Sequence, residues 1–338
     1  MSHFLPMARA AAAAGFEVVV ATRVGEHAGT VKTAGFRLIA IDSERHSTGV
    51  LKVLRYVART FTIIRNENPD IVHCIALRCV ILGGVAARLG GARALILAPT
   101  GLGYLWLQQG LLICAVRAVV STVVGSWLRG SRTRYLFENR DDPPEFGLSA
   151  DDADVTIIGG AGVDPTALPM YPEPIAPPVK IAVVARMIRP KGIEEAVAAA
   201  RRAQAKGAAI ELHLFGAPDP ANPTTFTDAD LRRLSAEPGI FWHGRAADIA
   251  QVWRDHHIAL LLSYREGLPR ALVEAAACGR PIVTTDVAGC REVVRDAKEG
   301  YLVPCADIDA AANALVAPAR CHPGGGSASE IPARLISS

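Results

Sequence analysis

The sequence predicts an α/β protein built from two Rossmann-like domains that face a cleft. Along most of the chain, short β-branched runs alternate with Ala-rich helical segments, and half of the 338 residues are hydrophobic. Near-continuous apolar strands separated by helices are typical of parallel sheets covered on both faces. The length allows two domains, each with its own core. Between the two halves, residues 165–178 contain six prolines, which indicates a stiff linker.

In each half, strands are expected where β-branched and apolar residues cluster. In the N-terminal half these are Phe16–Thr22, Phe36–Ile39, Asp70–Cys74, Ala94–Ala98 and Val155–Ile158. In the C-terminal half they are Lys180–Ala185, Ile210–Phe215, Ile240–Trp242, Ile258–Ser263, Pro281–Thr285 and Tyr301–Val303. Ligands of open parallel sheets bind beyond the carboxyl ends of the strands, so functional residues are expected in the loops that follow these strands.

The linker and the two ends of the chain set the expected domain boundaries. We expect an N-terminal domain over residues 1–172, a C-terminal domain over 173–318 and a disordered tail over 319–338, where prolines and three glycines interrupt the helical pattern of Ala310–Val316. The chain opens on a helical segment, so the first strand of the N-terminal domain is expected to be missing, as is the last C-terminal helix. Such a chain would be a fragment or a mis-started, frameshifted reading.

Composition excludes several classes of function. The chain carries 36 basic and 33 acidic residues, and its net charge of +3 provides no general field that would attract nucleic acid. Its seven cysteines are scattered without a Cys-x-x-Cys pair, so neither a zinc site nor a disulfide framework is predicted. The N-terminus lacks the basic start and apolar run of a signal peptide. We therefore expect a cytoplasmic protein with buried, reduced thiols.

One apolar segment, Leu105–Leu128, approaches the length of a membrane-spanning helix. Within it, residues 110–128 carry a single charged side chain, Arg117, and a span needs about 20 apolar residues. Two glutamines and two serines interrupt the segment. The pattern therefore favours an amphipathic helix, either embedded in the protein or facing a membrane, over a helix that crosses one.

Two cations follow the first strand of the C-terminal half. Arg186 comes directly after the strand, and Lys191 comes five residues later, beside the start of a helical segment over 193–206. A diphosphate can be neutralised by two cations together with the unpaired amide N–H groups of a helix N-terminus. The alternative is a pair of solvated surface charges.

Two glutamates follow the strand Ile258–Ser263. Glu266 precedes Gly267, whose amide a ligand can approach because no side chain blocks it, and Glu274 lies about one and a half turns into the next helix. Pro269 fits the first turn of that helix. Carboxylates so placed can accept hydrogen bonds from separate pairs of hydroxyl groups on one ligand, such as a hexose and a ribose. The alternative for Glu274 is an ordinary charge on the surface of a helix.

These residues resemble a known family, the retaining glycosyltransferases of family 4, which have the GT-B fold. That family shares a motif of two glutamates eight positions apart with Gly and Pro between them, and Glu266–Pro269 with Glu274 matches it in full. The segment 184–192, which contains the two cations, is similar to the family's donor-diphosphate pair. Residues 289–292 and 300–303 are similar to its later blocks.

The resemblance implies that the C-terminal domain binds a nucleoside-diphosphate sugar as donor substrate, without a metal and without a cofactor. Arg186 and Lys191 would bind the diphosphate and stabilise the charge that develops on it as it leaves. Glu266 would contact the transferred sugar, with the amides of Gly267 and Leu268 near the sugar and the phosphate.

The same resemblance implies contacts at the nucleoside end of the donor. Glu274 would bind the ribose. The segment His243-Gly244-Arg245, which follows the predicted strand Ile240–Trp242, would line the base.

In the N-terminal half, four blocks are similar to family members that assemble surface polysaccharides. They are 69–73, 100–104, 139–142 and 160–164. By this resemblance, His73 would lie in the cleft near the reacting sugar; taken alone, a histidine at a strand end is more often a structural hydrogen-bonding residue.

The implied acceptor is a glycan on a polyprenyl-diphosphate lipid, as in lipopolysaccharide assembly at the inner face of the cytoplasmic membrane. Leu105–Arg134 would then rest on that membrane, which would make the protein peripheral. A hydrophobic core helix is the alternative for this stretch.

Two other functions stay open. A nucleotide-sugar 2-epimerase has the same two-domain architecture but needs a different set of acid and base side chains. A truncated, inactive GT-B protein would bind a nucleotide sugar without turnover. A nicotinamide dehydrogenase is not supported, because no Gly-x-Gly-x-x-Gly follows a predicted strand.

Overall fold

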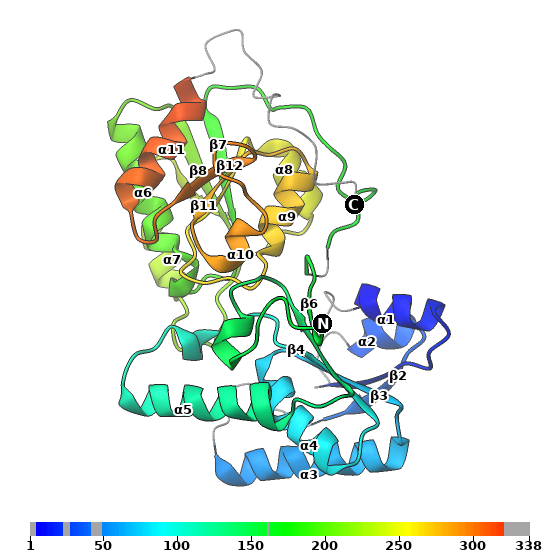
Figure 1. The fold of residues 1–338 in the computed structure, drawn as a ribbon. Helices are drawn as coiled ribbons and strands as arrows, with labels where there is room; N and C mark the ends of the chain where they lie inside the picture. The colour runs from blue at the N-terminus through cyan, green and yellow to red at the C-terminus, as the bar shows by residue number, and fades with distance from the viewer. Residues whose placement is uncertain (1–4, 23–27, 42–48, 161, 321–338) are drawn as a thin grey trace. The chain divides into compact units, whose positions relative to one another are not determined.

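In this computed structural model, residues 5–22, 28–41, 49–160 and 162–320 are described. They form two compact units, Met1–Ala161 and Gly162–Ser338 (Figure 1). Each unit contains parallel strands covered by helices, so the predicted α/β architecture of two Rossmann-like halves is confirmed.

The units separate at residue 161, eleven residues before the boundary expected from the prolines. The start of the proline-rich segment packs on the second unit instead of bridging the two. Leu168 is buried in the core of that unit, the amide of Tyr171 donates to the carbonyl of Cys278, and the Arg280 guanidinium donates to the carbonyls of Tyr171 and Pro172. These contacts involve residues more than a hundred positions away in the sequence, so the spacing of the prolines could not predict them.

The first unit contains two parallel sheets, with strand orders β1-β2 and β3-β4-β5-β6. Among the described residues the helix α1 precedes β1, as the helical opening of the chain predicts. The elements in chain order are α1 (Leu5–Ala13), β1 (Val19–Thr22), α2 (Ala28–Thr33), β2 (Arg37–Ala40), α3 (Val50–Glu67), β3 (Ile71–Ile75), the π-helical turn η2 (Cys79–Gly83), α4 (Gly84–Leu89), β4 (Ala94–Ala98), the 3-10 turn η3 (Tyr104–Trp106), α5 (Leu111–Thr122), the π-helical turn η4 (Val123–Trp127), β5 (Thr133–Phe137), the 3-10 turn η5 (Pro143–Phe146) and β6 (Val155–Ile157).

One layer of helices covers a face of the four-stranded sheet. The chain moves from β3 to β4 to β5 in one direction across the sheet, and right-handed crossovers place α4 and α5 on the same face. Helix α3 belongs to this layer because its Ile64 is buried against Ala86 and Ala87 of α4. Figure 1 shows the three helices along the same side of the unit.

Strand β5 was not among the strands predicted from the sequence. Its residues alternate between the core and the surface: Thr133, Tyr135 and Phe137 are buried, and Arg134 is exposed. In the sequence interpretation, the apolar segment before β5 was extended to Arg134. The change from the 3.6-residue period of a helix to the two-residue period of a strand was therefore overlooked. The strand lies between β4 and β6 and supplies Tyr135 and Phe137 to the core of the unit.

The apolar segment Leu105–Leu128 is interrupted instead of forming one helix. The 3-10 turn η3 ends at Trp106, Gly110 takes a φ of +128° that favours glycine, and α5 then runs from Leu111 into the turn η4. Of the residues in α5, only Val120 is buried. No helix in the described part of the chain is long and apolar enough to cross a membrane.

The second unit contains one six-stranded parallel sheet in the order β12-β11-β10-β7-β8-β9. Helices α6 and α11 pack on one face, and α8 and α9 pack on the other. The elements in chain order are β7 (Val179–Val184), the 3-10 turn η6 (Arg189–Lys191), α6 (Ile193–Ala205), β8 (Ile210–Phe215), α7 (Asp228–Leu234), β9 (Ile240–Trp242), α8 (Ile249–Asp255), β10 (Ile258–Leu261), α9 (Arg270–Ala277), β11 (Ile282–Thr285), α10 (Ala288–Arg291), β12 (Gly300–Val303) and α11 (Ile308–Arg320).

The strand order of this sheet reverses between β7 and β10. The chain builds β7, β8 and β9 toward one edge, returns to place β10 on the other side of β7, and continues through β11 to β12. The loops after β7 and β10 therefore lead to helices on opposite faces, and in sheets of this type ligands bind where the strand order reverses.

Helix α11 extends past the predicted helical segment Ala310–Val316 to Arg320. Its Ala311, Ala312 and Leu315 are buried against α6. The first two residues of the predicted disordered tail are therefore helical. Residues 321–338 lie outside the described residues.

Candidate functional site

Loops after three neighbouring strands, β7, β10 and β11, meet at the carboxyl edge of the second unit's sheet. The amide of Tyr264, after β10, donates to the carbonyl of Pro190, after β7, over 3.0 Å. The Tyr264 hydroxyl donates to Glu195 of α6 over 2.6 Å. Thr285, at the end of β11, donates its hydroxyl to the carbonyl of Ser263. These bonds hold the loops in one arrangement.

Lys191 and Glu266 form an ion pair between two of these loops. The Lys191 Nζ and the Glu266 Oε1 lie 2.5 Å apart, and the Glu266 residue is only 9% exposed. The two residues are 75 positions apart in the sequence, and the fold brings them together because β7 and β10 are neighbours. A charged hydrogen bond of this kind, shielded from water, is stronger than a surface ion pair.

Arg186 does not join this ion pair in the structure. Its guanidinium donates to Asp219 over 2.8 Å and is half exposed. The two cations that the sequence places five residues apart are therefore each held by a different carboxylate. An anion that binds at these two cations would therefore meet a carboxylate already paired with each of them.

Two glycines permit close approach between the loops. Gly192 has a φ of +68°, and a Cβ atom there would overlap the carbonyl oxygen of Leu262. A Cβ atom at Gly289 in α10 would overlap the carbonyl oxygen of Gly267. Both positions exclude any side chain, so Gly192 fixes the loop with Lys191 and Gly289 fixes the loop with Glu266.

Glu274 lies on α9, as predicted, and it is buried with 7% of the residue exposed. The guanidinium of Arg270, one turn earlier, donates to its carboxylate over 2.7 Å. Burial raises the pKa of Glu274 above its ordinary value, and the charge of Arg270 opposes this only in part. A buried carboxylate with incomplete compensation contradicts the alternative of a solvated charge on a helix surface.

The Glu274→Gln variant is expected to unfold at a higher urea concentration than the unchanged protein at neutral pH. Because burial raises the pKa of Glu274 in the folded protein, ionisation of this carboxyl group lowers the free energy of unfolding. This loss is absent at pH values below the pKa of the unfolded chain, where the group is protonated in both states. It is complete at pH values above the pKa of the folded protein. The difference between the two proteins should therefore vanish near pH 4 and grow toward pH 7. Equal or lower stability of the variant at pH 7 would contradict this account.

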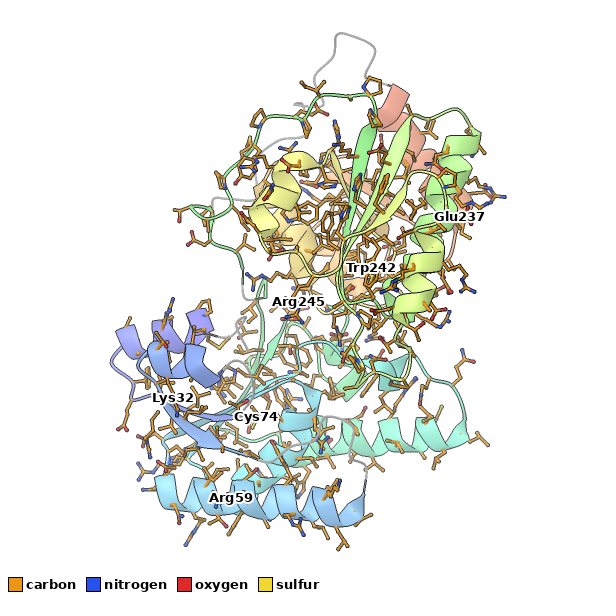
Figure 2. All side chains as sticks on the ribbon, turned by 180° about the vertical axis from the view of Figure 1, so that it is seen from behind. Lys32, Arg59, Cys74, Glu237, Trp242 and Arg245 are labelled. Atoms are coloured by element: carbon orange, nitrogen blue, oxygen red, sulfur yellow. The ribbon has the colours of Figure 1, made fainter. Side chains whose placement is uncertain are left out.

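The segment His243-Gly244-Arg245 follows β9 at the edge of the sheet, as predicted. The His243 ring stacks on Phe215 with their centroids 4.7 Å apart, and Gly244 has a φ of +70°. The Gly244 carbonyl accepts from the amide of Gly216, and the Trp242 indole donates to the Gly216 carbonyl. Figure 2 labels Trp242 and Arg245 in this unit.

A second histidine, His213 on β8, was missed by sequence reasoning. Its Nδ1 lies 2.9 Å from Nε2 of His243, and its Nε2 lies 3.3 Å from the Glu211 carboxylate. Burial lowers the pKa of His213 to about 4, and burial also lowers that of nearby His256 to about 4. The alternation of β8 could have placed Glu211 and His213 on one face, but not their partner on β9.

Lowering the pH from about 6.5 toward 4 is expected to destabilise the second unit. The unfolded chain binds protons at His213 and His256 in this range while the folded unit does not, because burial lowers both pKa values to about 4. Each imidazole contributes a slope of at most about 1.4 kcal/mol per pH unit. Urea unfolding at several pH values measures this slope, which should decrease in His213→Phe. The same slope in both proteins would rule out this origin.

His73 is the one predicted site residue in the first unit. The prediction placed it at a strand end, but β3 continues to Ile75, because Cys74 and Ile75 pair with Leu97 and Ala98 of β4. Its Nε2 is buried without a hydrogen-bond partner in the described part of the chain, and burial lowers its pKa. The ring is therefore neutral at pH 7.

The predicted residues of the second unit thus fall into two groups along one sheet edge. The first, after β7 and β10, contains Arg186, Lys191, Glu266, Gly267, Leu268 and Glu274; the second, after β9, contains His243, Gly244 and Arg245. Strands β10 and β9 are separated by β7 and β8, which is three inter-strand steps or about 14 Å. Within the described residues, no group of three or more His, Cys, Asp or Glu side chains is arranged to hold a metal ion.

Both units match known sequence families. Residues 1–123 match the family described as glycosyl transferase 4-like, and residues 178–319 match the family described as glycosyl transferases group 1. The two matches cover different parts of the chain and agree in the class of protein they indicate.

Individual proteins support the same class. The chain is 25% identical over 313 residues to an N,N'-diacetylbacillosaminyl-diphospho-undecaprenol alpha-1,3-N-acetylgalactosaminyltransferase of Campylobacter jejuni, covering 88% of this chain and 81% of that protein. It is 32% identical over 171 residues to an Escherichia coli K12 protein named as a glycosyltransferase of colanic acid biosynthesis, covering 47% of this chain and 41% of that protein. Its fold is similar to that of Anabaena HepE, solved with UDP and glucose, with a TM-score of 0.68, 16% identity and coverage of 93% and 85%.

Proposed function

Because the chain belongs to the GT-B glycosyltransferases of family 4, we propose that it transfers a sugar from a nucleoside-diphosphate donor to a lipid-linked glycan with retention. The observation that carries the donor assignment is the shielded Lys191–Glu266 pair at the point where the strand order of the sheet reverses. A cation for phosphate and a carboxylate for sugar hydroxyls lie in contact there, which matches the junction between diphosphate and sugar in such a donor.

The donor diphosphate would displace Glu266 from Lys191. The ammonium group would then bind phosphate oxygens, and the Glu266 carboxylate would be released to accept hydrogen bonds from the transferred sugar. Arg186 would leave Asp219 and bind the other phosphate. Two cations at the diphosphate stabilise the charge that develops as the bond to the sugar breaks.

Bond changes follow from this placement. The bond between the anomeric carbon and the β-phosphate oxygen breaks, and the nucleoside diphosphate leaves with the electron pair. The acceptor hydroxyl forms the new bond on the same face of the sugar, and its proton passes to the departing diphosphate. Lys191 and Arg186 act on the leaving group, and Glu266 holds the sugar.

The nucleoside end would extend along the sheet edge toward β9. Glu274 would bind the ribose hydroxyls, for which a buried carboxylate in the middle of α9 is suited. The base would lie against the segment His243–Arg245, where the stacked rings of His243 and Phe215 offer a flat surface. The sheet edge between these segments, about 14 Å, suits an extended ligand.

A glycan on a polyprenyl diphosphate is the proposed acceptor, in the assembly of a surface polysaccharide. The Campylobacter relative is named for transfer to an undecaprenol-diphosphate-linked sugar and matches most of this chain, which supports the proposal. His73 is proposed to lie near the reacting sugar, where its neutral ring can exchange hydrogen bonds with hydroxyl groups. An acceptor of this kind would place the enzyme at a membrane surface.

The experiment that tests this function joins binding with transfer. Titration calorimetry with UDP and with GDP identifies the nucleotide, and the matching radiolabelled nucleotide sugars are then incubated with a polyprenyl-diphosphate-linked sugar. We expect binding by one nucleotide and a labelled lipid product with the anomeric configuration of the donor. Inversion of that configuration would contradict retention. Interconversion of the donor to its epimer, or binding without transfer or hydrolysis, would overturn the proposed activity.

A further inference from the structure

Three side chains on β8 and directly after β9 form a continuous chain of polar contacts. The Nε2 of His213 lies 3.3 Å from the Glu211 carboxylate, and its Nδ1 lies 2.9 Å from Nε2 of His243. Glu211 and His213 point to the same face of the sheet because they are two residues apart on one strand. His243 joins them because β9 pairs with β8, in a register that places Phe241 opposite His213.

Neighbouring rings hold His213 in one orientation. Its side chain is only 12% exposed, stacks on Phe241 with their centroids 5.0 Å apart, and lies nearly perpendicular to the ring of His256. The planes of His213 and His243 differ by only 7°, and their centroids are 5.2 Å apart. The two facing nitrogens therefore point at each other along the ring planes, as a hydrogen bond between imidazoles requires.

Both imidazoles are uncharged at neutral pH. Burial, together with the positive charges that His243 and Lys180 carry when protonated, lowers the pKa of His213 to about 4. Burial also lowers the pKa of His243. A neutral imidazole has one N–H donor and one bare acceptor nitrogen, so the proton of each ring lies on one of two nitrogens.

The Glu211 carboxylate decides which nitrogens carry these protons. A carboxylate only accepts hydrogen bonds, so the Nε2 of His213 that faces it carries the proton, and Nδ1 of that ring is bare. The bare Nδ1 in turn requires a proton on the facing Nε2 of His243. The opposite arrangement would place a bare nitrogen against the carboxylate, with two acceptors in contact. His243, an exposed residue, is therefore left with a bare Nδ1.

We propose that Glu211 and His213 are positioning residues, which fix His243 as a hydrogen-bond acceptor for the base of the nucleotide. This rests on the proposed function, in which the base lies against the segment His243–Arg245, and it adds the class of base. Uracil and guanine carry a ring N–H on their Watson–Crick edge, which can donate to Nδ1 of His243. Cytosine and adenine have a bare ring nitrogen there, which would face another acceptor. The site therefore favours a donor built on uridine or guanosine diphosphate.

Nitrogen NMR of the full chain tests the tautomers without any ligand. In protein whose histidine rings contain an NMR-active nitrogen isotope, the chemical shift of each ring nitrogen distinguishes a protonated nitrogen from a bare one. His213→Asn and His243→Asn identify the signals by removing them. At pH 7 we expect the proton of both rings on Nε2. A proton on Nδ1 of His243 would overturn the proposal.

Glu211→Gln separates control of the tautomer from packing. The amide has nearly the same shape as the carboxyl group but can donate as well as accept, so the His213 proton is free to move to Nδ1. We expect both rings to show mixed tautomers, and nucleotide affinity to fall about twofold, because only the fraction with a bare Nδ1 on His243 is competent. The matched control is Glu237→Gln, since Glu237, which Figure 2 labels, pairs with Arg201 at the surface of the same unit. The control should leave the tautomers and the affinity unchanged.

Titration calorimetry with UDP, GDP, CDP and ADP tests the preference for the base. UDP or GDP is expected to bind about tenfold or more tightly than CDP and ADP, the scale of replacing a hydrogen bond by two acceptors in contact. His213→Leu should weaken binding of that nucleotide about three- to tenfold, because Nε2 of His243 loses its partner. His213→Asn should restore most of the affinity, because its amide oxygen can accept from that Nε2. Urea unfolding checks that each variant is folded.

Equal affinities for the four nucleotides, or equal weakening by the leucine and asparagine variants, would overturn the proposal. Failure of the proposed function gives a different result. If no nucleotide binds, the donor site and the preference for the base fail together. Normal sugar transfer by a protein whose His243 carries its proton on Nδ1 would contradict only the role of Glu211 and His213.

Discussion

Lys191→Ala is expected to lower kcat for sugar transfer by at least about tenfold, the scale of losing one contact to a developing negative charge. The Lys191 ammonium is the cation held within the loops by Glu266, and it is proposed to bind the diphosphate as that group leaves. Arg189→Ala is the matched control, since Arg189 lies in the same 3-10 turn but pairs with Glu194 and lies over the ring of Phe226. The control should change kcat by less than about twofold.

Glu266→Ala extends this experiment to a cycle of single and double variants. Each single variant should lose activity, and the double variant should lose less than the product of the two, because residues in contact are not energetically independent. Steady-state kinetics over a range of donor concentrations separates kcat from KM. Near-normal rates in both single variants would remove these loops from the donor site.

Gly289→Ala is expected to destabilise the second unit by about 3 kcal/mol, at the upper end of the cost of overpacking a tight contact. The added methyl group would overlap the carbonyl oxygen of Gly267 and also approach that of Glu266, so the loop must move. Because that loop carries the Glu266 carboxylate, nucleotide binding should weaken together with stability. Urea unfolding and titration with UDP or GDP measure the two effects on the same protein.

Gly159→Ala is the matched control for this substitution. A Cβ atom at Gly159 meets nothing within 4 Å, and the residue does not have a positive φ. Its stability should change by less than about 0.5 kcal/mol, as for an ordinary surface substitution. If Gly289→Ala behaves like this control, the close approach between α10 and the loop with Glu266 does not hold the site together.

Much of the fold could be predicted because its signals are local. Each of Ala94–Ala98 and Ile210–Phe215 is a continuous apolar or alternating run of one strand's length, and both agree with the structure to the residue. The motif from Glu266 to Glu274 also lies within one loop and one helix. Strand β5 was missed because the apolar segment before it was extended across Gly130 and Ser131 to Arg134, so the turn at these two residues was overlooked.

Interactions between distant segments could not be predicted from the sequence. Nothing in the sequence near Lys191 indicates that its partner is Glu266 and that Arg186 pairs with Asp219, because these contacts depend on which strands are neighbours. The same holds for His213, whose role arises only when β8 and β9 bring it to His243.

The Lys191–Glu266 pair has a further consequence for how the enzyme selects its donor. While the two side chains are paired, the Lys191 ammonium is less available to other anions, and the Glu266 carboxylate is less available to sugar hydroxyl groups. A free sugar has no phosphate group that could replace Glu266 at Lys191. Inorganic phosphate has no sugar hydroxyl groups that could bind the Glu266 carboxylate once it is released. In the proposed function, a nucleotide sugar would satisfy both partners at once, so the pair would act as a latch that opens fully only to a molecule carrying both a phosphate and sugar hydroxyl groups.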